Sequence, residues 1–114
     1  MTDQEIIQAF HVMWDAFPEP VTITQRSREM IAVNTKAAEL GLAPGIKCSS
    51  IGKPEDHRGC LCTKAIDTKK AIAVTYKGPS SEDLYGYWIP IPERPEWVIH
   101  FGVGRMPVYE PLKR

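Results

Sequence analysis

The sequence predicts an α+β domain in which short helices cover one face of a five-stranded antiparallel sheet. Two short alternating segments come early in the chain and three longer ones come late, with helical patterns before and between them. Turn residues separate the consecutive strands, so they pair most simply as antiparallel neighbours. Runs of strands around a helical insert are typical of α+β domains.

Length and charge narrow the classes of function. The chain has 114 residues, which is one ordinary domain. Its formal net charge is zero, which argues against nucleic acid as a partner. No apolar run approaches the roughly 20 residues that span a bilayer, and the acidic N-terminus is unlike a secretory signal. We therefore expect a cytoplasmic protein without a membrane partner, whose three cysteines are reduced thiols.

Residues 1–17 form the first segment, and 3–17 are predicted to be an amphipathic helix. Thr2 and Glu5 fit a capping box, and Pro18 and Pro20 end the helix. An apolar stripe follows the helical period: Ile6, Phe10, Met13 and Phe17. The stripe packs either on the domain's own sheet or on a second copy of the chain. The second alternative makes these four residues the predicted dimer interface.

A hairpin and a short helix follow. Val21 and Ile23 alternate with threonines, and Ile31 and Val33 alternate after a polar break, which predicts two short strands. Asn34 then stands where its side chain accepts the free amides of a helix over residues 35–41. Gly41 suits the left-handed position that ends such a helix.

The second half of the chain is predicted to be one helix followed by three strands. Residues 60–70 show a helical pattern, and residues 71–78, 81–92 and 96–106 alternate like strands. On the last strand, His100 falls on the face opposite to Trp97, Ile99 and Phe101, and beside Gly102. A glycine there leaves room for close approach by a ligand or a helix.

The order of elements, together with the sequence "MIAVNTKAAELGL", resembles the PAS sensor-domain family. In that family a strand ends in Asn and runs into a helix of the form N-x-x-A-x-x-L-G, and Asn34, Ala37 or Ala38, Leu40 and Gly41 stand in that pattern here. The resemblance covers residues 15–106. It implies a sheet of order 2-1-5-4-3 with helices cupped over one face, a small molecule or cofactor bound in the cup, and dimers formed through the N-terminal helix. The matching domain is 18–106, followed by a tail over 107–114.

The sequence departs from the family where many members end the last strand with Asp-Ile-Thr and continue into an output helix. Arg105, Met106 and Pro107 stand there instead. Proline in a helix interior costs about 3 kcal/mol, so we expect no signalling helix to follow the sheet within this chain. A PAS module of this kind acts alone or through its N-terminal helix.

Residues 45–62 hold all three cysteines and one histidine. "G-x-x-C" at Gly45–Cys48 is similar to a motif of some PAS domains, but their following "C-x-x-C" is shortened here to Cys60-Leu61-Cys62. Soft ligands of this kind suit zinc or an iron–sulfur cluster. The candidate metal ligands are Cys48, His57, Cys60 and Cys62. On a helix, Cys60 and Cys62 point to different sides, so both ligate only where the chain is irregular.

The same residues leave four other interpretations open. Cys60 is the candidate reactive thiol, because a helix that begins near Gly59 places it in the first turn. Cys62 lies on the apolar side and Cys48 is similarly a candidate for an inert buried thiol. A strained Cys60–Cys62 disulfide would be a redox switch. A small enzyme would use Cys60 as nucleophile and His57 as base.

These observations lead to one main hypothesis. The chain is expected to be a PAS-type sensory or ligand-binding module, not an enzyme, that signals through a homodimer or a signalling partner. The alternative is a metal- or redox-sensing domain built on the four-residue cysteine and histidine cluster. The predicted ligand is a small organic molecule, and its candidate lining comprises Ile66, Ile72, Val74, Trp88, Ile99 and Phe101.

Overall fold

The computed structural model describes residues 1–51, 60–78 and 80–104. The elements in chain order are α1 (Asp3–Trp14), β1 (Val21–Gln25), β2 (Met30–Val33), α2 (Thr35–Glu39), the 3₁₀ turn η1 (Cys48–Ser50), α3 (Cys62–Thr68), β3 (Ile72–Lys77), β4 (Asp83–Ile91) and β5 (Arg94–Gly104). Met106, the tail 107–114 and the departure from the Asp-Ile-Thr motif lie outside the described residues.

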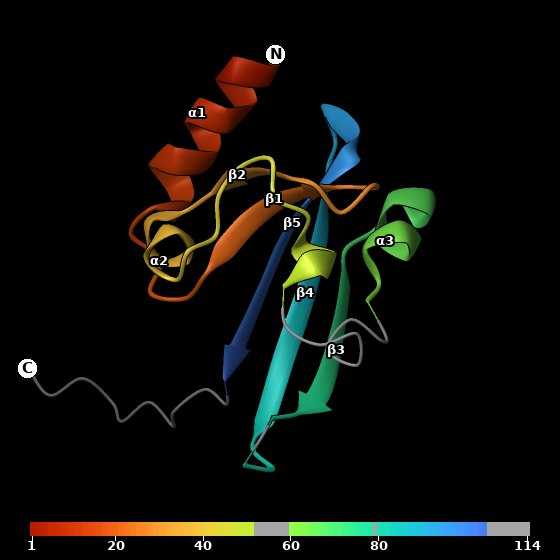
Figure 1. The fold of residues 1–114 in the computed structure, drawn as a ribbon. Coiled ribbons are helices and arrows are strands. Elements are labelled where there is room, and N and C mark those ends of the chain that lie inside the picture. The colour runs from red at the N-terminus through yellow and green to blue at the C-terminus, as the bar shows by residue number, and fades with distance from the viewer. Residues whose placement is uncertain (52–59, 79, 105–114) are drawn as a thin grey trace, which may run out of the picture.

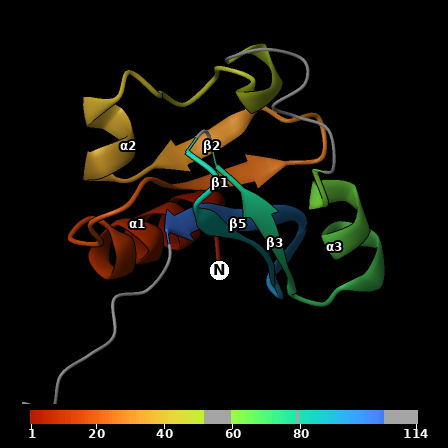
Figure 2. The same cartoon turned by 90° about the horizontal axis from the view of Figure 1, so that it is seen from below.

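The strands form one antiparallel sheet of order β2-β1-β5-β4-β3. This confirms the predicted α+β fold and the predicted strand order. The central strand β5 pairs with β1 on one side, with Thr22 opposite His100, and with β4 on the other, with Trp88 opposite His100. Figure 1 shows β4 and β5 as long strands, while α1 and α3 lie on different sides of the sheet; Figure 2 shows the strands between these two helices.

The capping residues in the sequence correctly predicted where α1 and α2 begin. Thr2 and Glu5 form the predicted capping box, in which the Thr2 side chain accepts the Glu5 amide. Asn34 caps α2 by accepting the Ala37 amide at 3.0 Å, and Gly41 takes the left-handed conformation with φ of 89°. The first helix ends at Trp14 rather than at residue 17, because the chain turns before the two prolines.

The alternation of side chains divides the sheet into two faces. On the α1 face, Ile6 and Phe10 of α1 pack against Val21, Ile23 and Trp97. On the α3 face, Cys62, Ala65 and Ile66 of α3 pack against Trp88 and Val98. Met30, Val33 and Ala37 form a smaller cluster beneath α2. Each helix therefore covers only part of the sheet, and a different part.

Asn34 connects α1 to the sheet. Its side-chain oxygen accepts the Val21 amide at 2.9 Å as well as the Ala37 amide. Its amide group donates to the carbonyls of Trp14 and Glu19, both at 3.0 Å. Asn34 is fully buried, so these bonds satisfy a polar group whose burial would otherwise be costly. One side chain thus fixes the end of α1, the start of β1 and the start of α2.

Among the residues that the structure describes, no helix has the length and apolar character needed to cross a bilayer.

Candidate functional site

A row of one hydroxyl-bearing, one imidazole and one indole side chain crosses the centre of the α3 face. Thr22, His100 and Trp88 lie opposite one another across β1, β5 and β4. Thr22 and Thr24 are both buried, and their hydroxyl oxygens are 3.0 Å apart, within hydrogen-bond distance. The sheet therefore presents two hydroxyls and an imidazole on the face that the short helices cover. A residue with a titratable ring in such a place is a candidate for ligand contact.

His100 is held in one orientation. Its ring stacks on the Trp88 ring with centroids 4.6 Å apart and an interplanar angle of 13°. Its Nδ1 lies 2.9 Å from the Tyr87 carbonyl oxygen. A carbonyl only accepts hydrogen bonds, so Nδ1 carries the proton and donates.

This arrangement fixes the chemistry of the other ring nitrogen. Burial lowers the pKa of His100, and the hydrogen bond to Tyr87 opposes that effect only in part. The ring is accordingly neutral at neutral pH. With Nδ1 protonated, Nε2 is an acceptor, which would favour a ligand that donates an N–H or O–H group.

Side chains of the protein occupy the space beside two glycines of this face. Gly86 and Gly102 are directly opposite each other on β4 and β5. A Cβ atom on Gly102 would lie 3.0 Å from the Tyr76 hydroxyl, and one on Gly86 would lie 3.3 Å from the Trp88 ring. Aromatic side chains of the same sheet therefore lie against both positions, and a larger residue would require them to shift. The expectation that Gly102 leaves room for a ligand or a helix is therefore wrong.

The six residues of the predicted ligand lining do not come together. Ile66, Ile72, Val74 and Trp88 belong to the cluster beneath α3. Ile99 and Phe101 instead pack in the cluster beneath α1. Successive residues of a strand point to opposite faces, so Ile99 and Phe101 lie on the other side of the sheet from His100. The six residues therefore do not share one face, and His100, Thr22 and Thr24 are on the face that carries the other four.

The apolar stripe of α1 packs on the chain's own sheet. Ile6 and Phe10 are 5% and 4% exposed, and Phe17 is half-buried against the same cluster. Met13, by contrast, is 73% exposed, as is its neighbour Val12 at 86%. The expectation that all four residues of the stripe form a dimer interface is thus wrong for Ile6 and Phe10, which already have a partner.

The helix that contains the cysteines begins later than expected. It starts at Cys62, its N-cap residue is Leu61, and no side chain caps it. Cys60 therefore precedes the helix instead of lying in its first turn, and the helix-terminus argument for its reactivity does not hold. Gly59 and His57 lie outside the described residues. Cys60 itself is half-buried beside the cluster beneath α3.

The pKa values of the other two thiols, Cys48 and Cys62, are raised in the folded protein. Cys62 is 1% exposed, as its place on the apolar side of the helix predicted. Burial raises the pKa of Cys62 to about 11, although Arg28 lowers it. Burial also raises the pKa of Cys48, and the neighbouring Cys60 adds to that increase. Both groups are therefore protonated thiols at neutral pH, which are poor nucleophiles and poor metal ligands.

The described part of the chain gives no support to the predicted metal site. It contains no group of three or more His, Cys, Asp or Glu side chains placed to hold a metal ion. The fourth predicted ligand, His57, is outside the described residues. For zinc or an iron–sulfur cluster, the three cysteines would also have to lose their protons, which the burial of Cys62 opposes.

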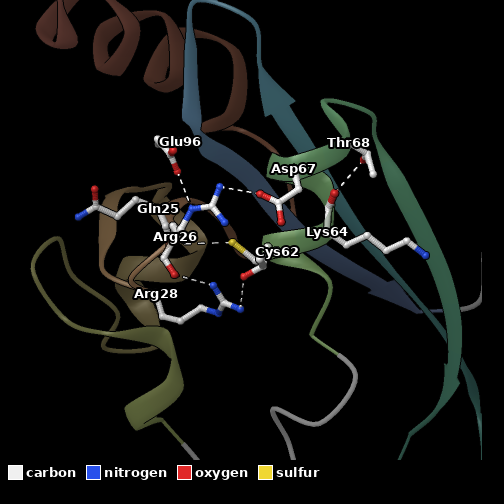
Figure 3. Close-up of polar contacts among 9 residues, drawn as sticks. Gln25, Arg26, Arg28, Cys62, Lys64, Asp67, Thr68 and Glu96 are labelled. Atoms are coloured by element: carbon white, nitrogen blue, oxygen red, sulfur yellow. Dashed lines mark hydrogen bonds and ion pairs between the residues drawn. The ribbon is translucent and has the colours of Figure 1, made fainter.

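The β1–β2 turn fastens α3 to the sheet (Figure 3). Arg26 donates to Asp67 of α3 at 2.8 Å and to Glu96 of β5 at 2.9 Å. Arg28, with φ of 77°, donates to the Thr63 hydroxyl of α3 at 3.0 Å. The Cys62 sulfur lies 3.9 Å from the Gln25 carbonyl oxygen. These contacts were not predicted, because the polar segment between the two strands indicated only a turn.

Comparison with known proteins supports the fold. No protein-family model matches the sequence, and no significant match is found among curated proteins. Several solved structures are similar in fold, among them a histidine kinase, a LOV protein and a PAS domain. One is a sensory box sensor histidine kinase from Vibrio cholerae, which is 12% identical in sequence. The match covers 89% of this chain and 88% of the kinase chain, with a TM-score of 0.63. The LOV protein from Rhodobacter sphaeroides is 13% identical over 94% of this chain and 72% of its own, with a TM-score of 0.54.

A third structure is the PAS domain of a protein from Colwellia psychrerythraea. It is 17% identical, covers 90% of this chain and 93% of its own, and has a TM-score of 0.51. At such identities the likeness concerns the fold alone. The chain has a PAS-like fold, as the resemblance in its sequence implied.

Proposed function

We propose that this chain is a cytoplasmic sensory module that binds a small, neutral organic molecule on the α3 face of its sheet. The observation that carries the proposal is the row formed by Thr22, His100 and Trp88, which places oriented polar groups on a face otherwise lined by apolar side chains. Ligand sites commonly combine apolar walls with a few fixed polar groups. The role is binding without catalysis.

The chemistry of this row favours an uncharged ligand. Along the strands, the described residues nearest to His100 on this face are apolar, aromatic or hydroxyl-bearing, such as Ile72, Val98 and Thr24. The charged residue farther along β5 on this face, Glu96, is already paired with Arg26. A charged ligand would lose its hydration without gaining an opposite charge there. A planar ligand with a hydrogen-bond donor would pair with Nε2 of His100.

Mass spectrometry tests this proposal directly. Protein measured under native conditions is expected to carry an added mass that disappears under denaturing conditions. The His100→Ala variant should lose the bound molecule, whereas Met13→Ala, on the other face, should keep it. If the native protein has only the mass of the chain, and a panel of small heteroaromatic compounds leaves its thermal midpoint unchanged, the binding proposal is refuted.

We also propose that signalling uses a homodimer formed on the α1 face, or a signalling protein that binds the same surface. Val12 and Met13 are exposed on α1, and a groove of about 150 Å³ lies next to them, between α1 and the sheet, with a lining that is almost wholly apolar. Exposed apolar surface of this kind is typical of interaction sites. Light scattering of the purified protein should give a dimer mass that Met13→Glu reduces to a monomer mass; a monomer at every concentration would refute the homodimer.

A further inference from the structure

The ring of Tyr76 reaches from β3, at the end of the sheet, across β4 to β5. A Cβ atom placed on Gly86 of β4 would lie 3.4 Å from Cε1 of Tyr76, and one placed on Gly102 of β5 would lie 3.0 Å from the Tyr76 hydroxyl oxygen. The two glycines are directly opposite each other in the sheet. Because neither has a side chain, the phenol ring comes close to the backbone of both strands. The hydroxyl group of a β3 residue is thus placed over β5.

The Tyr76 hydroxyl and the His100 imidazole lie on the same face of the sheet. Val74 packs beneath α3, and Tyr76, two residues further along β3, points to the same face. His100 and Gly102 are also two residues apart, on β5, which separates their Cα atoms by about 7 Å. Since the Tyr76 hydroxyl lies over Gly102, one small molecule can contact this hydroxyl and the His100 ring together.

Trp88 lies between these two polar groups. Its ring stacks on the His100 imidazole with centroids 4.6 Å apart, and its edge is 3.3 Å from the Cβ position of Gly86, over which the Tyr76 ring also passes. The imidazole, indole and phenol rings are therefore neighbours on one face. Tyr76 is 46% exposed, so solvent reaches this aromatic surface at its Tyr76 end.

We infer that Tyr76 determines the specificity of the proposed ligand site, and that the ligand is a planar molecule with a hydrogen-bond acceptor as well as a donor. The inference rests on the proposed function and makes it more specific. Nε2 of His100 accepts the N–H or O–H group of the ligand, and the Tyr76 hydroxyl donates to its carbonyl oxygen or ring nitrogen. The flat body of the ligand packs against the aromatic rings. A cyclic amide, which holds an N–H and a carbonyl group in one plane, is the simplest chemical class that meets both requirements.

The test compares two planar probes of nearly equal size by isothermal titration calorimetry. Oxindole has an N–H donor and a carbonyl acceptor, whereas indole has the N–H donor alone. Wild-type protein is expected to bind oxindole about fivefold more tightly than indole, which is the effect of one additional hydrogen bond. Tyr76→Phe keeps the ring and removes only the hydroxyl, so it should bind the two probes equally, with its affinity for indole unchanged. Gly102→Ala places a methyl group against the hydroxyl and should also abolish the preference.

Thr75→Ala, at the exposed neighbouring position on the other face of β3, is the matched control and should keep the wild-type preference for oxindole. Circular dichroism checks that each variant is folded, and Tyr76→Phe decides the question by itself if Gly102→Ala does not fold. The inference is overturned if Tyr76→Phe retains the preference, or if wild-type protein binds the probes equally or binds neither. The native mass of wild type and of His100→Ala decides on the proposed function separately, so the inference can fail while the proposed function stands.

Discussion

The face of the sheet beneath α1 is closed by apolar side chains, whereas the face beneath α3 combines apolar packing with hydroxyls, an imidazole and thiols. On the first face Phe10, Ile23 and Trp97 contact one another without a buried titratable group among them. On the second, His100 stacks on Trp88 beside Thr22. The comparison separates a face that packs through apolar side chains from a face that also carries polar and titratable groups, on which we propose that a ligand binds.

The largest loss of stability on mutation is expected on the α1 face. Replacing Phe10 by alanine removes a nearly buried ring from the main cluster and should lower the free energy of unfolding by about 4 kcal/mol. Met13→Ala, on the same helix but exposed, should change it by less than about 0.5 kcal/mol. Urea denaturation of both variants checks this. Equal losses would mean that the helix does not pack on its own sheet.

Asn34 connects the two faces and should give the next largest effect. The Asn34→Ala substitution removes the side-chain oxygen that accepts the buried Val21 and Ala37 amides. An unsatisfied buried group costs about 1 to 3 kcal/mol, so the total loss should be about 3 kcal/mol. Thr35→Ala, at the exposed next position, is the control and should be nearly neutral. Denaturation midpoints that agree between the two variants would contradict this role for Asn34.

The pH dependence of stability distinguishes the α3 face from the α1 face. The pKa of His100 is lower in the folded protein than its ordinary value of 6.5, so the unfolded chain binds its proton first as the pH falls. Stability from this group is therefore complete above about pH 6.5 and decreases as the pH falls below it. Urea denaturation from pH 8 to 5 should show this decrease in wild type and a smaller one in His100→Gln.

His11 supplies the control for that measurement. It lies on α1, where its Nδ1 is 2.9 Å from an Asp15 carboxylate oxygen. The His11→Gln variant should keep the decrease that His100 causes. If removing His11 abolishes the decrease and removing His100 does not, the buried neutral imidazole is not the source.

The smallest effect is expected at the surface contacts of α3. Arg26 is 43% exposed and pairs with two exposed carboxylates, Asp67 and Glu96. Exposed ion pairs contribute little and salt screens them. Arg26→Ala should therefore lower the thermal midpoint only slightly at low salt, and not at high salt. A large loss that persists in high salt would show that the turn holds α3 by more than these ion pairs.

The helices and strands themselves follow from local patterns. The 3.6-residue stripe of α1 and the two-residue alternation of the strands identified every described strand and the order of the helices. The capping box at Thr2 and Glu5 and the cap at Asn34 were predictable too, because each depends on residues within one turn. The start of α3 was less predictable, since no capping side chain marks it.

What the sequence determined by itself is which side chains share a face; what only the tertiary structure decided is which helix covers that face. Alternation placed His100 opposite to Ile99 and Phe101, but it did not say that α1 would cover the latter and α3 the former. Likewise, the β1–β2 turn and α3 are far apart in the chain, and only the folded protein brings Arg26 to Asp67, Arg28 to Thr63 and Cys62 to the Gln25 carbonyl. Periodicity arises from backbone geometry within a few residues, whereas the partner of each face depends on contacts between segments that are far apart in the chain.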